Sequence, residues 1–133
     1  MMHSPLHRTA AAVLLGLFAM LSSCAKPKEI DYKKLGGDDT TLIDPDTKKP
    51  FDGIAKDFHK NGQVSMEIPI KNGKFHGTVK DWYPNGSKKA ETEFADGERC
   101  GKCTEWTVAG QLFVECFYDH DKPVSRKEYT SPK

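Results

Sequence analysis

The four cysteines are the residues of this sequence best suited to chemistry, and their positions suggest different roles. Cys24 follows a short apolar segment near the start of the chain, whereas Cys100, Cys103 and Cys116 lie in its last third. A thiol can carry a lipid, form a disulfide, coordinate a metal ion or perform redox catalysis. The compartment and the elements that hold each cysteine decide among these roles.

The segment Cys100-Gly101-Lys102-Cys103 has the C-x-x-C spacing of redox-active dithiols and of half a metal site. A dithiol of the thioredoxin type needs a βαβ setting, with its cysteine at the start of a helix. This motif lies instead at a turn between two segments that read as strands. A thiol oxidoreductase that uses Cys100 and Cys103 is therefore the least favoured function.

The other polar clusters do not indicate an active site or a cofactor. The sequence has no serine in a nucleophile elbow, no glycine-rich phosphate loop and no zinc-binding helix. His76 and Cys100 fall two strands apart, about 9.6 Å at ordinary strand spacing, which is too far for one tetrahedral zinc ion. Asp44-Pro45-Asp46 and Asp119-His120-Asp121 read as solvated acidic turns. We expect no enzyme activity, no metal and no cofactor.

The first residues of the chain predict export. A weakly basic start precedes the apolar run 10–20, which is about half the ~20 residues that a helix needs to cross a bilayer. Such a run followed by small residues is typical of a cleaved signal peptide, here residues 1–23. Leu21-Ser22-Ser23-Cys24 resembles the lipobox of bacterial lipoproteins, which implies lipidation of Cys24, including palmitate. A secretory signal with a chance cysteine is the alternative.

Lipid chains on Cys24 would anchor the protein in the bacterial cell envelope. Ala25, rather than an aspartate, follows Cys24 and favours the outer membrane over the inner one. Residues 24–39 are mostly polar and are predicted to form a flexible tether behind the lipidated cysteine. The 20 Lys and Arg residues nearly balance the 19 Asp and Glu residues, so we expect no nucleic-acid partner.

One repeat period, equal to the spacing from Gly53 to Gly77, organises the rest of the chain. It predicts a repeat domain over 40–124, with units 53–76, 77–100 and 101–124, and a C-terminal tail over 125–133. Four sets of residues carry the period: Gly53, Gly77 and Gly101; Gly62, Gly86 and Gly110; Phe58, Trp82 and Trp106; Glu67, Glu91 and Glu115. Because these independent positions agree on one register, chance is a poor explanation.

Each unit reads as a pair of strands separated by turns. Asn61-Gly62 and Asn85-Gly86 lie in the middle of a unit, and Asn72-Gly73 and Asp96-Gly97 lie near the end of one. These dipeptides favour two-residue hairpin turns, and the runs between them alternate between apolar and polar residues. We predict an all-β fold, an antiparallel meander of three hairpin repeats that forms an elongated, twisted single sheet.

The proposed turns predict which residues face each other across the hairpins. A two-residue loop at Asn61-Gly62 places Lys56 opposite Glu67, and the second unit repeats this charge pair at the equivalent positions. In the third unit the same register places Cys103 opposite Cys116, at a position where the Cα atoms are close. In an oxidising compartment we expect a Cys103–Cys116 disulfide rather than Cys100–Cys103.

The register also separates the two faces of the sheet. One face carries the Lys–Glu pairs and an aromatic ladder that is a candidate binding surface, with cross-strand packing as the alternative: Phe58, Trp82 and Trp106. The other face is largely apolar and carries further candidate binding residues near the end turns: Ile70, Phe94 and Tyr118. An apolar face needs a cover, which the N-terminal segment, the C-terminal tail, a second copy or a partner would supply.

The repeat resembles MORN repeats. The pattern Gly-x-x-Lys-Asp-(Phe/Trp)-(His/Tyr)-x-Asn-Gly, followed by the glutamate and the end turn, is similar to the variant in YwqK-family antitoxin proteins, over about residues 50–121. Ala109 and Asp121 depart from the pattern in the third unit, as in degenerate terminal repeats. The resemblance implies a β-hairpin array that neutralises a toxin by direct contact.

The sequence therefore favours a non-catalytic, membrane-anchored binding module of the cell envelope. Its expected partner is a protein, a toxin or another envelope protein, bound on the apolar face or by strand addition at an open sheet edge. An immunity-like role against an exported toxin agrees with both the lipobox and the resemblance to YwqK-family proteins. The alternative is a structural envelope lipoprotein that binds cell wall or lipid.

Overall fold

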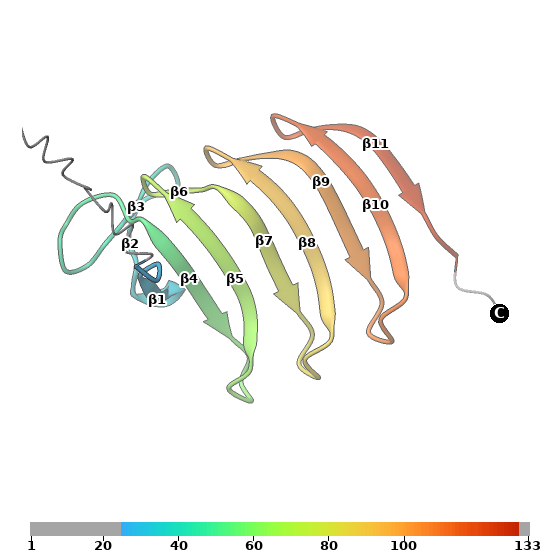
Figure 1. Cartoon of the computed structure of the whole chain (residues 1–133), viewed down its shortest axis with the longest axis horizontal. Coiled ribbons are helices and arrows are strands. Elements are labelled where there is room, and N and C mark those ends of the chain that lie inside the picture. The colour runs from blue at the N-terminus through green and yellow to red at the C-terminus, as the bar shows by residue number, and fades with distance from the viewer. Residues whose placement is uncertain (1–24, 131–133) are drawn as a thin grey trace, which may run out of the picture.

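The computed structural model describes residues 25–130, which are almost wholly β (Figure 1). Nine strands form one sheet, and its order follows the chain from the first repeat onward. This confirms the predicted antiparallel meander in a single twisted sheet. The predicted signal peptide and Cys24 lie outside the described residues. Within residues 25–130, no helix has the length and apolar character needed to span a membrane.

The repeat array holds eight of the strands. They are β4 (Gly53–Phe58), β5 (Val64–Lys71), β6 (Lys74–Phe75), β7 (Gly77–Trp82), β8 (Lys88–Ala95), β9 (Glu98–Trp106), β10 (Leu112–Asp119) and β11 (Lys122–Glu128). The segment before them contains β1 (Glu29–Asp31), the 3-10 helix η1 (Tyr32–Lys34), β2 (Gly36–Gly37) and β3 (Leu42–Ile43).

The strand register agrees with the register predicted from the repeat. Lys56 lies opposite Glu67, Lys80 lies opposite Glu91, and Cys103 lies opposite Cys116. The structure extends these pairs into one row across the sheet, in which the charges alternate except at Thr104: Lys56, Glu67, Lys80, Glu91, Thr104, Glu115 and Lys127. The row thus links all three hairpins on one face.

The ion pairs along this row differ from those that the sequence predicts. The Nζ atom of Lys56 lies 2.8 Å from a carboxylate oxygen of Glu29, and that of Lys80 lies 3.5 Å from Glu67. Glu91 instead contacts Lys88, at 2.7 Å. Each charge in the row except Lys127, on the edge strand, has neighbours on two strands, so the long lysine side chains can select a partner other than the one directly opposite.

The mid-unit turns also differ from the predicted two-residue loops. In the first unit the amide of Gly62 donates to the carbonyl of His59 at 2.9 Å, and the amide of His59 donates to Gln63 at 2.8 Å. This makes a three-residue loop that ends on Gly62 at φ +83°. A β-bulge between Asp57 and Phe58 absorbs the extra residue. The predicted register is therefore correct although the loop is longer.

The end turns are the two-residue turns that the sequence predicts. Asn72 and Gly73 adopt φ values of +50° and +74°, which is the left-handed conformation that a type I′ hairpin requires. The last turn does so without glycine, since His120 and Asp121 have φ values of +47° and +63°. Arg99 holds this turn through its backbone amide and its Nε atom, which donate to Asp121 Oδ1 at 3.1 and 2.8 Å.

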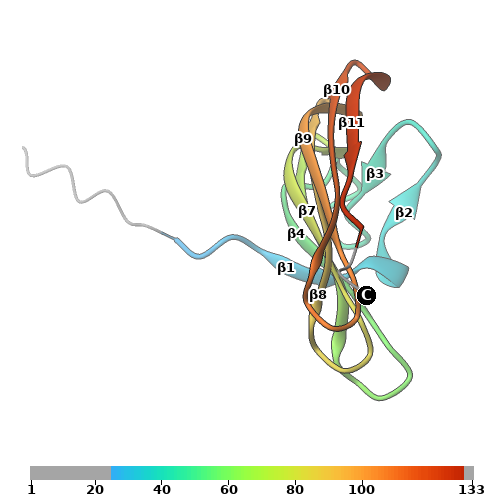
Figure 2. The ribbon, with the colours of Figure 1, turned by 90° about the vertical axis from the view of Figure 1, so that its right-hand side faces the viewer.

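The N-terminal segment covers the first part of the apolar face (Figure 2). β1 pairs in parallel with β4, and the core beneath the segment contains Phe51, Ala55, Ile68, Ile70 and Val79, all less than 6% exposed. The predicted tether is thus corrected over residues 29–37, which hold β1, η1 and β2. The sequence predicts a tether here because this segment is mostly polar. Only a few apolar side chains in it contact the core.

The C-terminal end of the array also differs from its predicted boundary. Residues 125–128 were expected in the tail, but they continue β11, which pairs with β10 along its length. Every residue of β11 is exposed, so its sequence lacks the apolar alternation that marks a strand. Backbone pairing with β10, rather than burial, holds this edge strand in the sheet.

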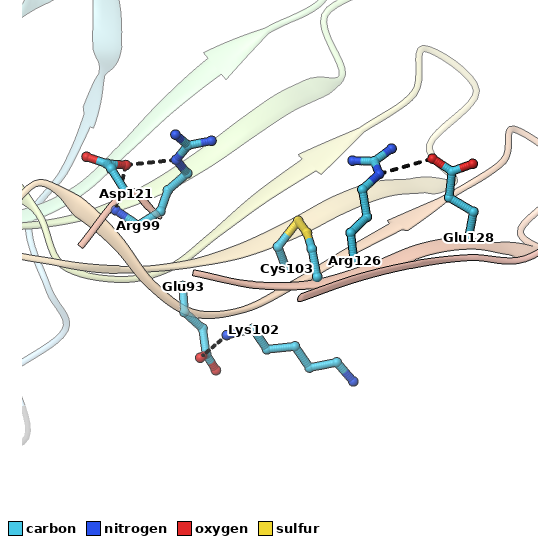
Figure 3. The surroundings of a disulfide bond; sticks show 8 residues. Glu93, Arg99, Lys102, Cys103, Asp121, Arg126 and Glu128 are labelled. Carbon is cyan, nitrogen blue, oxygen red and sulfur yellow. Dashed lines mark hydrogen bonds and ion pairs between the residues drawn. A yellow bond between two sulfur atoms is a disulfide. The ribbon is translucent and has the colours of Figure 1, made fainter. Parts of the chain in front are cut away.

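A disulfide joins Cys103 and Cys116 across the third hairpin (Figure 3), the pair that the register predicts. The two cysteines and Val114 form a second small core, against which Tyr118 packs.

Lys102 points to the side of the sheet opposite Cys103, as strand alternation requires (Figure 3). Cys100 is two residues from Lys102 on the same strand and so lies on the same face of the sheet as Lys102. It is a free, half-buried thiol. It therefore cannot form a dithiol with Cys103.

Two glycine substitutions test the contact between the N-terminal segment and the repeat. A Cβ atom at Gly62 would meet no other atom within 4 Å, whereas one at Gly73 would lie 2.7 Å from the carbonyl oxygen of Leu42. Gly62→Ala should cost about 1 kcal/mol through its left-handed backbone alone. Gly73→Ala should cost at least about twice as much in urea unfolding. Equal costs would contradict the observed packing of residues 41–42 on this turn.

Removal of the disulfide should destabilise the array. Its cysteines are separated by 13 residues, and closure of such a loop typically contributes about 2–4 kcal/mol. We expect a loss of this size in urea unfolding of the Cys103→Ala/Cys116→Ala double variant. A reducing agent should weaken the unaltered protein and leave the double variant unchanged. Equal sensitivity of both proteins would contradict the assigned bridge.

Candidate functional site

Three of the predicted binding residues have structural roles. Ile70 is only 4% exposed and belongs to the main core. Phe94 packs against the same core and makes an edge-to-face contact with Phe75, with ring centroids 5.5 Å apart. Tyr118 packs against the second core beneath the guanidinium of Arg99. The protein itself covers Ile70, whereas Phe94 and Tyr118 are half-buried and keep part of their side chains at the surface.

The predicted aromatic ladder is not continuous. Phe58, Trp82 and Trp106 lie on alternate strands, so another strand separates each from the next. Lys88 faces Trp82, and its Nζ atom lies 5.2 Å from the ring centroid of Trp106. Among residues 25–130, the only close pair of aromatic rings is Phe75–Phe94. Direct stacking along the ladder therefore does not explain these aromatics.

The candidate site is a groove of about 710 Å³ at the mid-unit-turn edge of the second and third hairpins. Strands β7 and β8 form one side, and β9 and β10 with their connecting turn form the other. Its lining combines carboxylates with aromatic and aliphatic side chains: Asp81, Tyr83, Lys89, Ala90, Glu105, Trp106, Thr107, Val108 and Phe113. Of the predicted binding residues, only Trp106 lines it.

Backbone register and one side-chain hydrogen bond position the groove. Ala90 lies opposite Asp81 on one side and Glu105 on the other, so the two acids stand two strands apart on one face. The hydroxyl of Tyr83 donates to the carbonyl oxygen of Trp106 at 2.9 Å, which ties the second hairpin to the third. Small Ala90 leaves the space between the carboxylates open. Val108 and Phe113 are 57% and 44% exposed at the rim.

The carboxylate of Asp81 in the groove has no cation close to it. Burial raises the pKa of Asp81 above its ordinary value, and the more distant charge of Lys89 offsets this only in part. Neither Asp81 nor Glu105 joins the ion pairs formed within the described part of the chain. The groove can therefore accept a positively charged group, with apolar contact from its rim.

The repeat-equivalent position in the first hairpin shows a contrasting arrangement. Asp57, Asp81 and Glu105 are spaced by the repeat period. Lys33 of η1 lies 3.0 Å from Asp57, and this hydrogen bond lowers the pKa of Asp57. The N-terminal segment thus neutralises the first acid and does not reach the other two. The spacing of these acids was a signal that the sequence analysis missed, but only the fold shows which of them stay unpaired.

A smaller hollow of about 430 Å³ lies between the N-terminal segment and the end turns of the first two hairpins. Its walls carry Asp38, Asp39, Asp96 and Glu98 around Tyr32 and Phe75. Asp38 is largely engaged in its own loop, since Thr40 and Thr41 donate to its Oδ1 atom and lower its pKa. This hollow is therefore less open to a charged ligand than the groove.

Comparison with known proteins identifies the repeat. Residues 51–72 and 75–96 each match the MORN repeat variant family. The chain carries MORN repeats. No curated protein and no solved structure matches it. The two matched segments correspond to strands β4–β5 and β6–β8. The third hairpin, β9–β10, lies outside the matched residues but has the same strand register.

The contrast between Asp57 and Asp81 predicts opposite stability changes. Because the folded state holds a proton on Asp81 more tightly than the unfolded state, stability falls as the pH rises from its ordinary pKa of 3.8 to the raised value. Asp81→Asn should therefore stabilise the protein near neutral pH, with a gain that shrinks in more acidic solution. Urea unfolding across this pH range measures the change.

Asp57→Asn is the matched control at the equivalent position. The lowered pKa of Asp57 contributes stability above its ordinary value of 3.8, and this contribution is lost as the pH falls. Asp57→Asn should therefore destabilise the protein near neutral pH. The assigned environments would be contradicted if both substitutions changed the free energy of unfolding in the same direction.

Proposed function

We propose that the protein is a non-catalytic binding module that accepts a basic segment of a partner protein in the groove between its second and third hairpins. The observation that carries this proposal is the pair of unpaired carboxylates, Asp81 and Glu105, beside an exposed apolar rim. A half-buried carboxylate without a cation costs stability, so its presence has an explanation if a ligand supplies the charge.

The lining of the groove favours a lysine or arginine side chain as the bound group. Two carboxylates and one lysine give the lining a net negative charge. Trp106 and Phe113 offer aromatic surface to the long aliphatic stem or the planar guanidinium of such a residue. A peptide chain lying along the mid-unit turns would place its basic side chain between Asp81 and Glu105.

Binding on a face is favoured over strand addition at the sheet edge. The outer edge of β11 is open, but this strand contains Lys122, Pro123, Arg126 and Lys127. Charged residues and proline at an edge oppose pairing with another strand. The first part of the apolar face is covered by the N-terminal segment. The groove therefore provides the better contact surface for a partner.

We also propose that lipidation of Cys24 holds this module at the bacterial outer membrane, and that the partner is an exported toxin or another envelope protein. The lipobox-like Leu21-Ser22-Ser23-Cys24 and the similarity of the repeat to YwqK-family antitoxins support this finer assignment. Labelled palmitate should enter the protein in cells and should be lost in Cys24→Ser. Incorporation that persists in this variant would contradict lipidation at Cys24.

Peptide binding tests the groove directly. A peptide rich in lysine and arginine should bind the full chain and change the fluorescence of Trp106, because its side chains would approach that indole. A peptide of equal length with glutamine at the basic positions should bind at least tenfold more weakly, about 1.4 kcal/mol. Asp81→Asn and Glu105→Gln should each weaken binding of the basic peptide by a similar factor.

Glu98→Gln is the matched control, because Glu98 is an exposed acid at the other end of the same strand as Glu105. It changes the net charge equally and should leave binding unchanged. Equal weakening by Glu98→Gln would indicate general charge attraction rather than a groove. Tight binding of the glutamine peptide would reject a basic ligand. Capture from an envelope extract with the unaltered protein and Asp81→Asn in parallel would then identify the natural partner.

A further inference from the structure

The end of the third hairpin brings together three side chains of metal-ligand type. The thiol of Cys100, the carboxylate of Asp119 and the imidazole of His120 each place one ligand atom within 4.8 Å of the others. They form the only such group of at least three histidine, cysteine or acidic residues that the described part of the chain contains. Thiolate, imidazole and carboxylate are the three ligand types that zinc accepts in proteins.

The hairpin register explains why these residues meet. Cys103 lies opposite Cys116 in the hairpin. Because the strands are antiparallel, Cys100 and Asp119, each three residues further from the mid-unit turn, also lie opposite each other. His120 is the first residue of the end turn, and its left-handed backbone turns the chain back beside Cys100. The Nδ1 atom of His120 lies 2.6 Å from Oδ1 of Asp119, which orients the imidazole. The cluster is thus built on paired strands rather than on a loose loop.

The equivalent positions in the other two hairpins hold their end turns by hydrogen bonds. Asp52 accepts from the amide of Asn72 at 2.7 Å, and His76 accepts from the amide of Asp96 at 3.4 Å. The third hairpin has a thiol at this position, which is a weak hydrogen-bond acceptor. It also lacks glycine in its turn, although it keeps the same two-residue geometry. A bound ion would connect this position to the turn, in addition to the hydrogen bonds between Arg99 and Asp121.

Among the described residues, no lysine or arginine forms an ion pair with Asp119, although Lys122 lies opposite it in the register. Asp121, the other acid of the turn, is engaged by Arg99 through two hydrogen bonds. Arg99 occupies the opposite face of β9, as the alternation of side chains along a strand requires. The side chains of Asp119 and His120 are 68% and 71% exposed, so an ion can reach them from solvent. The disulfide holds the two strands in register close by.

We propose that Cys100, Asp119 and His120 bind a divalent ion of the zinc class at the end turn of the third hairpin. The thiolate selects against magnesium and calcium, which prefer oxygen ligands. Three protein ligands leave at least one position of a tetrahedral ion for water or for a donor from a partner. Metal binding would fasten the non-glycine end turn to β9, and it is independent of the groove and of the function proposed for it.

Cobalt is the probe for this site because a thiolate bound to Co²⁺ gives a charge-transfer absorption in the near ultraviolet. Titration of the full-length protein in detergent with Co²⁺ should produce this band with a stoichiometry of one ion per chain. Zinc should then displace cobalt and abolish the band. Cys100→Ser should remove the band, while Asp119→Asn and His120→Gln should each weaken cobalt binding at least tenfold.

His76→Gln is the matched control, since His76 occupies the position of Cys100 in the preceding hairpin. It should leave cobalt binding unchanged. Absence of the band at millimolar Co²⁺ would overturn the proposal, and so would a band that persists in Cys100→Ser, because another thiol would then be the ligand. Equal affinity in the unaltered protein, Asp119→Asn and His120→Gln would also overturn it. Far-ultraviolet circular dichroism checks that each variant retains its strands.

Discussion

The need to cover the apolar face of a single sheet governs the rest of this structure. A sheet without a second layer leaves one face open to water unless another part of the chain packs on it. Here the N-terminal segment supplies Ile30, Tyr32, Leu35 and Leu42 to the core over the first hairpin and part of the second. The cover ends before the third hairpin. The array therefore has a well-buried beginning and a more exposed end, so its three hairpins are not equally buried.

The third hairpin compensates for the missing cover by covalent and polar contacts. Cys103 and Cys116 occupy the row that holds Ala55, Ile68 and Val79 in the covered part of the face, and the disulfide replaces packing that these residues obtain from the N-terminal segment. On the other face Glu115 contacts Lys102 at 2.9 Å and accepts a hydrogen bond from Tyr129, beyond the end of β11. Both contacts tie adjacent strands together where hydrophobic burial is small.

The same unequal cover creates the two candidate sites. Lys33 neutralises Asp57 because η1 lies over the first hairpin, whereas Asp81 and Glu105 lie beyond its reach and face the groove. At the opposite edge, the last end turn has lost its glycine, and the residues that remain there include a thiol, a carboxylate and an imidazole. In both places the candidate site lies where the second or the third hairpin differs from the first. Both proposed sites therefore lie toward the C-terminal end of the array.

The sequence alone determined the meander, its register and the Cys103–Cys116 pair, because side chains in a sheet alternate with a period of two and the repeat applies that rule in three successive units. The register was correct even though each mid-unit loop is longer than expected, since a bulge restores it. The tertiary structure alone decided which acids stay unpaired, where each lysine finds its ion pair, that Ile70 belongs to the core, and that Cys100 meets Asp119 and His120. These outcomes depend on the N-terminal cover and on the path of a turn, and neither follows the repeat, so no periodicity in the sequence records them.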